Sequence, residues 1–213
     1  MWYIFFMNKD HLPKKLAVFP LSNFIIFPKT TVPLNIFEQR YLDLVNDAYR
    51  KNKYMGMIQA KNDDNEIFNV GCLGKISDYQ ESEDGRVLIN LTGISRFKIT
   101  KEISNKKLYR EFQVEYKSFI EDDDNKSKKI DTENLISKSK IFFKKNGLLI
   151  NWREFERLDE LQKINTLAMI APITNQEKQK LLEAITLDNK INVLESIISF
   201  YLYENGINNH TIQ

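Results

Sequence analysis

The chain has 213 residues, of which 42% are hydrophobic, and a net charge of +2. This length allows one or two domains with a buried core. Its 31 basic residues are nearly balanced by 29 acidic ones, which argues against a dedicated polyanion-binding protein, because such domains concentrate Lys and Arg at high pI.

The chain opens with the apolar heptapeptide MWYIFFM, followed by the polar NKDH. The heptapeptide lacks the basic region and cleavage site of a secretory signal, and it is too short to span a bilayer. We expect either an added edge strand or, preferably, a true translation start at Met7. No other apolar run reaches membrane length, so we expect no membrane association.

The first half of the chain is expected to be β-rich, with one helix over residues 38–51. Within it, Tyr41, Leu44, Val45 and Ala48 follow the i, i+3, i+4, i+7 spacing of an amphipathic helix packed on a sheet. Short apolar or alternating runs with turn signals between them predict strands at 16–21, 34–37, 54–60, 70–79, 86–93, 96–103 and 108–120. Such a series indicates a small closed or nearly closed barrel.

Prolines and glycines mark the ends and irregularities of these strands. Pro28 and Pro33 belong at strand ends or on an edge, because proline cannot donate to a ladder. Gly71 and Gly74 suggest a bulge or a close backbone approach. The pair Asp84-Gly85 predicts a hairpin turn.

Cys72 is the only cysteine, so no intramolecular disulfide can form. This fits a reducing compartment, and we expect a cytoplasmic protein. The thiol lies in the apolar stretch VGCLGKI, where a buried small hydrophobe is a better interpretation than a reactive nucleophile.

The charged run EDDDNKSKK, residues 121–129, predicts a linker between a domain at 1–122 and a domain at 130–213. A calcium loop is a poorer interpretation, because the run lacks the central Gly and the terminal Glu.

The second domain is expected to be a bundle of four amphipathic helices. One covers 131–145 with Gly147 as its C′ residue, and one covers 154–170. The third follows a capping box at Thr174 and Glu177. The fourth is capped by Asp188, with Gly206 beyond its end.

Catalytic signatures are missing from the sequence. The two histidines, His11 and His210, lie near the two ends, which argues against a triad or a zinc site. In GCLGKI the glycines are too close for a phosphate loop, and Ile76 replaces its hydroxyl residue. We therefore expect no catalytic residue, no metal, no cofactor and no enzymatic activity.

Five segments occur in the order typical of one family: LAVFPL at 16–21, FPKTTVPLNIFEQRY at 27–41, VGCLGKI at 70–76, DGRVLINLTGISRFKI at 84–99 and EKQKLLEAITLDNKINVL at 177–194. From Leu16 onward the chain resembles the Lon protease N-terminal, or substrate-binding, domain. The resemblance implies an α+β fold: a PUA-like β-barrel with one packed helix, then a C-terminal helical bundle, without ATPase and protease domains. Lys29 stands where the family usually has Gly, so we expect a less strained turn there.

The resemblance also implies a function. It predicts a non-enzymatic protein- or peptide-recognition module, an adaptor or holdase whose partners are unfolded or hydrophobic polypeptides and a protease machine. The alternative is an RNA-binding PUA-like module, although the near-neutral charge argues against nucleic acid.

The candidate binding residues are one apolar segment and one arginine. Phe24, Ile25, Ile26 and Phe27 form a proline-flanked apolar stretch, which either presents an exposed patch or fills the barrel mouth and packs on the helix at 38–51. Arg96 either holds a carboxylate or phosphate or braces a strand end. An exposed strand edge could also accept a peptide as an added strand.

Overall fold

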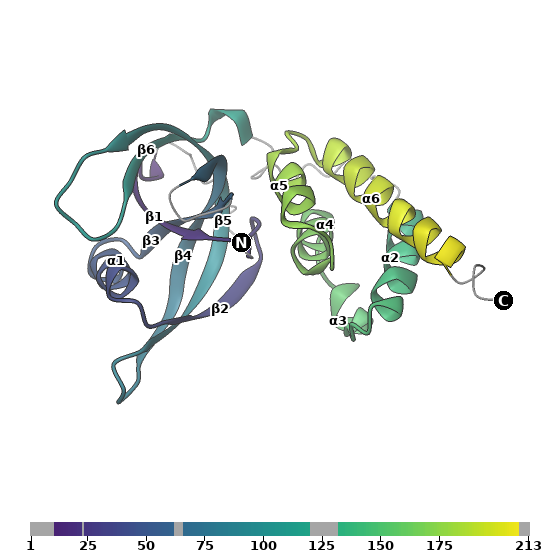
Figure 1. Ribbon diagram of the computed structural model, residues 1–213, viewed down its shortest axis with the longest axis horizontal. Helices are drawn as coiled ribbons and strands as arrows, with labels where there is room; N and C mark the ends of the chain where they lie inside the picture. The colour runs from purple at the N-terminus through teal and green to yellow at the C-terminus, as the bar shows by residue number, and fades with distance from the viewer. Residues whose placement is uncertain (1–10, 23, 62–65, 120–131, 209–213) are drawn as a thin grey trace, which may run out of the picture. The chain divides into compact units, whose positions relative to one another are not determined.

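The computed structural model describes residues 11–22, 24–61, 66–119 and 132–208, with side chains as far as Tyr203. The chain divides into two compact units, Met1–Asn125 and Lys126–Gln213 (Figure 1). The N-terminal heptapeptide with Met7, the run 121–129 and His210 lie outside the described residues. A six-stranded sheet with six helices confirms the α+β class expected from the sequence.

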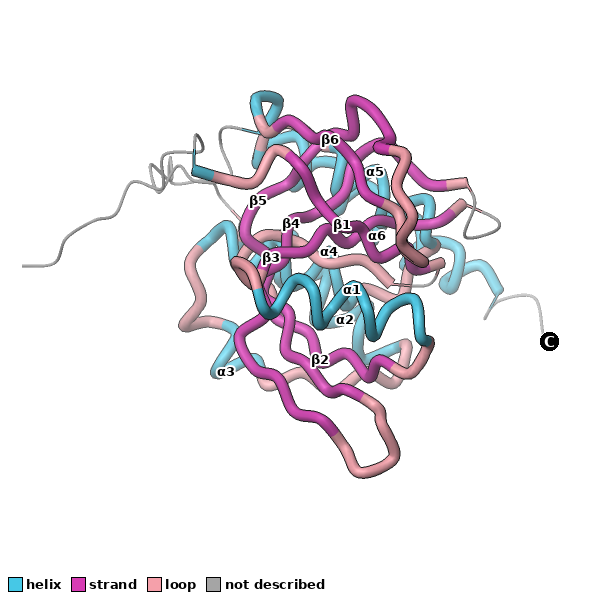
Figure 2. Tube along the Cα trace, turned by 90° about the vertical axis from the view of Figure 1, so that its left-hand side faces the viewer, coloured by secondary structure: helices cyan, strands magenta, loops and turns pink. Residues whose placement is uncertain are grey.

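The first unit holds all the described strands and one helix. The strands are β1 (Lys15–Leu21), β2 (Thr31–Ile36), β3 (Tyr54–Ala60), β4 (Ile67–Glu81), β5 (Val87–Ile103) and β6 (Glu111–Glu115), and the helix is α1 (Gln39–Arg50). The strand order is β2-β5-β4-β3-β1-β6, and β6 also pairs with β5. The five strands β1, β3, β4, β5 and β6 therefore form a closed hydrogen-bonded ring, in which β6 pairs with residues 98–103 of β5. The remaining strand, β2, pairs with residues 87–92 of β5 and extends away from the ring beside the hairpin that joins β4 to β5 (Figure 2).

Apolar side chains fill the inside of the ring. Phe97 is fully buried there, in a cluster with Leu16, Val18, Ile58, Leu73, Phe112 and Val114. Gly71 makes room for it, because a Cβ at that position would lie 2.6 Å from both the Phe97 ring and a backbone oxygen. The close approach expected at this glycine is thus confirmed, and so is the bulge at Gly74, where the β4–β5 register shifts.

Helix α1 packs its apolar stripe on the outer face of the sheet. Tyr41, Leu44, Val45 and Ala48 are buried as the periodicity predicts, and Tyr41 meets Phe19 of β1 with ring centroids 4.2 Å apart. Cys72 is fully buried, which confirms its interpretation as a small core residue.

Two strand predictions are wrong. The runs 86–93 and 96–103 are one continuous strand, β5, because Gly93 lies inside it rather than ending it. The strand expected over 108–120 shortens to Glu111–Glu115, because the preceding residues form a loop tied to α1 by side-chain hydrogen bonds. The hairpin at Asp84-Gly85 is confirmed, with Gly85 at φ +80°.

The second unit contains α2 (Glu133–Lys145), α3 (Trp152–Phe155), α4 (Glu160–Ile170), α5 (Asn175–Glu183) and α6 (Leu187–Asn208). Helices α2 and α6 lie side by side, where Lys138 donates to Glu195 at 2.8 Å and the rings of Phe142 and Tyr201 are 5.6 Å apart.

Local capping explains where the helix predictions held and failed. Thr174 and Glu177 form the expected capping box of α5. The helix expected over 154–170 is two helices, because Asp159 begins α4 with its own capping box. Thr186 rather than Asp188 caps α6, accepting from the Asn189 N–H at 3.1 Å, and Gly206 lies within this helix.

Candidate functional site

The predicted apolar segment lies mostly in the interior. Phe24 is half-buried, whereas Ile25, Ile26 and Phe27 are 4%, 1% and 0% exposed. Their burial supports the alternative in which this stretch packs inside the protein. A binding role for the segment stays a prediction, and Phe24 is the member that a ligand can reach without rearrangement.

A tight turn from Phe27 to Thr30 fixes the end of this segment. The Thr30 N–H and hydroxyl both donate to the Phe27 carbonyl, at 3.2 and 2.7 Å. Pro28 is the second residue of this turn and Lys29, with φ +62°, is the third, which is the arrangement of a type II turn. The expectation of a less strained turn is wrong, because lysine here adopts the left-handed conformation that favours glycine.

Gly93 of β5 holds the turn on the sheet. The Lys29 N–H donates to the Gly93 carbonyl, and the Gly93 N–H donates to the Thr30 carbonyl, both at 2.8 Å. A Cβ on Gly93 would lie 2.1 Å from the Phe27 carbonyl oxygen. Glycine is therefore required where the turn packs on β5. The sequence instead predicts the end of a strand at this glycine.

Arg96 lies three residues farther along β5, inside the strand rather than at its end. Its side chain is 2% exposed, and its guanidinium carbon lies 4.4 Å from the centre of the Phe119 ring. The structure thus brings both predicted binding elements to one stretch of β5. A ligand-binding role for Arg96 stays a prediction.

β2 is the edge strand at one end of the strand order. Pro33 lies in its middle, as expected for a proline on an edge. Because proline has no N–H and blunts an edge against pairing, addition of a peptide strand along this edge is disfavoured.

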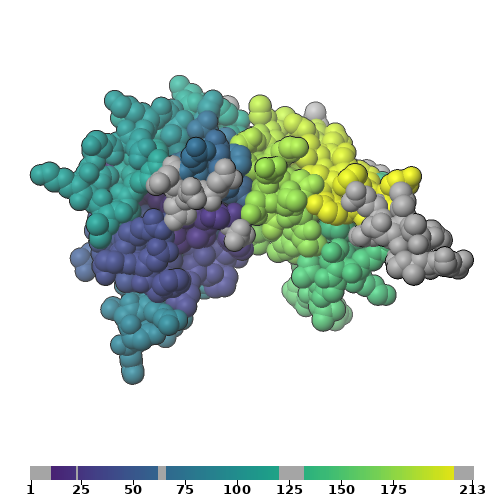
Figure 3. Space-filling model, viewed as in Figure 1, coloured from purple at the N-terminus to yellow at the C-terminus, as the bar shows by residue number. Residues whose placement is uncertain are grey.

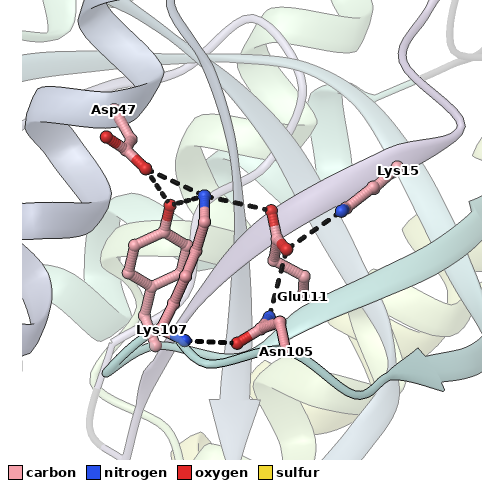
Figure 4. A network of polar contacts seen from close by, with 6 residues as sticks. Lys15, Asp47, Asn105, Lys107 and Glu111 are labelled. Atoms are coloured by element: carbon pink, nitrogen blue, oxygen red, sulfur yellow. Dashed lines mark hydrogen bonds and ion pairs between the residues drawn. The ribbon is translucent and has the colours of Figure 1, made fainter.

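A polar network joins α1 to the loop before β6, as Figure 4 shows. Lys107 and Tyr109 donate to the same oxygen of Asp47, at 2.8 and 2.6 Å. These bonds lower the pKa of the Asp47 carboxyl, whereas burial and the bond to Asp47 raise the pKa of Tyr109 to about 12. The pKa of Lys107 is also raised, chiefly by its hydrogen bond to Asp47.

Glu111 extends this network to β1. It pairs with Lys15 at 3.0 Å, accepts from Asn105 at 3.0 Å and lies 3.6 Å from the Lys107 ammonium. Burial opposes its ionisation, but the Lys15 bond and the Lys107 charge outweigh it and lower the pKa of Glu111. The network therefore acts as a clamp that fixes the loop. Sequence reasoning missed it, because its partners are far apart in the chain, 62 residues for Asp47 and Tyr109, and follow no periodic pattern.

Several large apolar side chains are exposed. In the first unit they are Phe37, Leu88 and Leu108, and in the second they are Ile141, Leu148, Leu149, Ile185, Phe200 and Tyr203. Over the described ranges, no group of three or more His, Cys, Asp or Glu residues could hold a metal ion. No helix among the described residues has the length and apolarity needed to cross a bilayer.

Comparison with known families matches residues 15–199 to the ATP-dependent protease La (LON) substrate-binding domain. A Lon protease of Flavobacterium johnsoniae is 30% identical over 104 residues, covering 46% of this chain and 13% of that protein. A Lon protease of Azospirillum brasilense is 24% identical over 201 residues, covering 88% of this chain and 24% of that protein. The chain thus spans a quarter or less of these two relatives.

Two solved structures share the fold. A Lon N-terminal domain protein from Xanthomonas campestris has a TM-score of 0.61 at 21% identity, covering 87% of this chain and 97% of the other. The N-terminal domain of a Mycobacterium avium complex Lon protease also has a TM-score of 0.61, at 16% identity, with coverages of 87% and 98%. None of these four matches supports the RNA-binding alternative.

Proposed function

The chain belongs to the LON substrate-binding domain family, and on that premise we propose that it is a non-enzymatic module that recognises polypeptides. The family match over residues 15–199 is the observation that carries this proposal. Its partners would be unfolded or hydrophobic polypeptides, which it would hold or deliver to a protease machine in the cytoplasm.

Two features of the fold support the finer parts of the proposal. The closed ring of five strands supports a PUA-like barrel within a domain at 1–122. The packing of α2 against α6 supports a helical bundle within a domain at 130–213.

The exposed apolar side chains support recognition of unfolded polypeptides, because such side chains offer contact area to apolar segments that a folded client hides. Of the residues predicted to bind, Phe24 can contribute directly. Ile25, Ile26, Phe27 and Arg96 would have to be uncovered first, since each is at most 4% exposed.

Aggregation of a heat-labile client, followed by light scattering, tests the holding activity. The full chain at a few-fold molar excess is expected to slow aggregation without ATP, because it covers apolar segments of the unfolding client. A folded protein of similar mass and charge is the control. If the client aggregates equally fast with the chain and with the control, the holdase proposal is wrong.

A further inference from the structure

The connection between α2 and α3 is a short turn over residues 146–151. We call this turn, together with the end of α2 and the start of α3, the α2–α3 corner (residues 141–153). Helix α2 ends in a Schellman motif: the Leu148 N–H donates to the Phe143 carbonyl at 3.0 Å, the Gly147 N–H donates to the Lys144 carbonyl at 3.1 Å, and Gly147 has φ +70°. At the other end, Asn151 caps α3 through the Glu154 N–H. Only two residues, Leu149 and Ile150, lie between the Schellman motif and this cap.

Leu149, in the middle of this turn, is 100% exposed. In a Schellman motif the residue after the C′ glycine usually packs back on the helix. Here that residue is Leu148, which is 39% exposed and so less exposed than Leu149. Trp152 anchors the far side, with its ring 6.1 Å from that of Phe143 and 5.3 Å from that of Phe155. Leu149 is therefore held out in solvent by an ordered backbone. The green atoms of this part of the chain form the lower edge of the second unit in Figure 3.

Cations without acidic partners flank this leucine in the sequence. Residues 140–157 hold five cations and two carboxylates, and both carboxylates are taken, Glu156 by Lys140 and Glu154 by Arg157. Among the described side chains, the other three cations, at 144, 145 and 153, make no ion pair, and all three are exposed.

The helix dipole explains only part of this charge. Lys144 and Lys145 lie in the last turn of α2, where cations are favourable. Arg153 lies in α3, a single turn of four residues with little macrodipole of its own, so the dipole does not account for this cation. The positive charge around Leu149 therefore exceeds what local helix stability requires.

We propose that the α2–α3 corner binds polypeptide segments in which apolar side chains lie next to carboxylates, an inference that rests on the proposed recognition of polypeptides. Charge complementarity identifies this partner: its carboxylates would pair with Lys144, Lys145 and Arg153, and an apolar side chain would cover Leu149. The ordered turn makes the site pre-organised, so little conformational entropy is lost on binding.

The spacing of the corner suggests the pattern of the bound segment. Ile141, 53% exposed, lies three and four residues before the two lysines and so on their side of α2. Four residues of helix rise about 6 Å, which is roughly two residues of extended chain. An extended segment would therefore place a carboxylate about two residues from each apolar side chain.

A lipid surface fits the corner less well. A single leucine is much less apolar than a myristoyl chain, which by itself gives only marginal, reversible membrane binding. Nucleic acid would leave Leu149 without a role in affinity, because phosphate contacts come from the cations alone.

Fluorescence anisotropy with three labelled 12-residue peptides tests the proposal. Each has leucine at every second position, and the intervening residues are Glu, Gln or Lys. The full chain is expected to bind the Glu peptide at least tenfold more tightly than the Gln peptide, and to bind the Lys peptide worst. Leu149→Ser and the double change Lys144→Gln, Lys145→Gln should each weaken Glu-peptide binding about tenfold.

Leu88→Ser is the matched control, because Leu88 is also an exposed leucine near a cation, but Arg86 is already paired with Asp84. It should weaken Glu-peptide binding far less than Leu149→Ser does. Circular dichroism should show all variants folded, since the altered side chains are exposed.

Equal binding of the three peptides, or full Glu-peptide binding by Leu149→Ser, would overturn the corner assignment and leave polypeptide recognition standing. Binding of none of the peptides would count against the proposed function as well. Leu149-dependent binding to phosphatidylserine vesicles without binding of the Glu peptide would replace the polypeptide by a membrane.

Discussion

Replacing Lys29 by glycine is expected to stabilise the first unit. Lys29 has φ +62° in the turn that follows the buried segment. The left-handed conformation costs an L-residue roughly 1–2 kcal/mol, and glycine removes that cost. Glycine also gives the unfolded chain more freedom, which costs about 0.4–1 kcal/mol. The net stabilisation expected for Lys29→Gly is therefore about 0.5–1 kcal/mol.

Urea denaturation followed by circular dichroism measures this change, and two further lysines calibrate it. Lys53 also has positive φ, at 64°, so Lys53→Gly should stabilise by a similar amount. Lys98 is an exposed residue of β5 at ordinary φ, so Lys98→Gly should destabilise by about 0.5–1 kcal/mol. If Lys29→Gly destabilises as Lys98→Gly does, the left-handed turn is refuted.

Three other substitutions test further contacts within the first unit. Gly93→Ala should destabilise by about 1–3 kcal/mol in urea titrations, because its Cβ would lie 2.1 Å from a carbonyl oxygen; an unchanged midpoint would contradict this close approach. Asp47→Asn should cost about 0.2–1 kcal/mol at pH 7. Because the pKa of Asp47 is lowered on folding, this difference should shrink as the pH falls below about 4 and vanish once the pH is below the lowered pKa of Asp47. Arg96→Met should lower the free energy of unfolding by about 2 kcal/mol. Arg40→Met should lower it less, because the Arg40 guanidinium lies over a ring at the same distance of 4.4 Å but its side chain is partly exposed. Equal losses would contradict the role of burial.

Local patterns predicted most of the secondary structure. The stripe of α1, the capping box at Thr174 and the C′ glycine at Gly147 are signals within a few residues, and all three were predicted correctly. Gly93 was misjudged, because whether a glycine ends a strand or allows a close crossing depends on the turn at 27–30, more than 60 residues earlier.

The surface was harder to predict than the core. The composition of Phe24–Phe27 is compatible with an exposed binding loop and with a buried core segment. Only the fold shows that most of this segment is buried. Leu149 would be assigned to the interior from its residue type, yet it is fully exposed, because the Schellman motif and the Asn151 cap together fix the backbone around it. Exposure of a single leucine depends on these two local structures jointly and on the packing of Trp152.

The most direct test of polypeptide recognition is an equilibrium titration of the full chain with one labelled protein in two states. One state is reduced and carboxymethylated, so that it stays unfolded, and the other is native. The account predicts saturable binding of the unfolded state at least tenfold tighter than that of the native state, without nucleotide. Equal affinities for the two states, or no binding of the unfolded state, would contradict it.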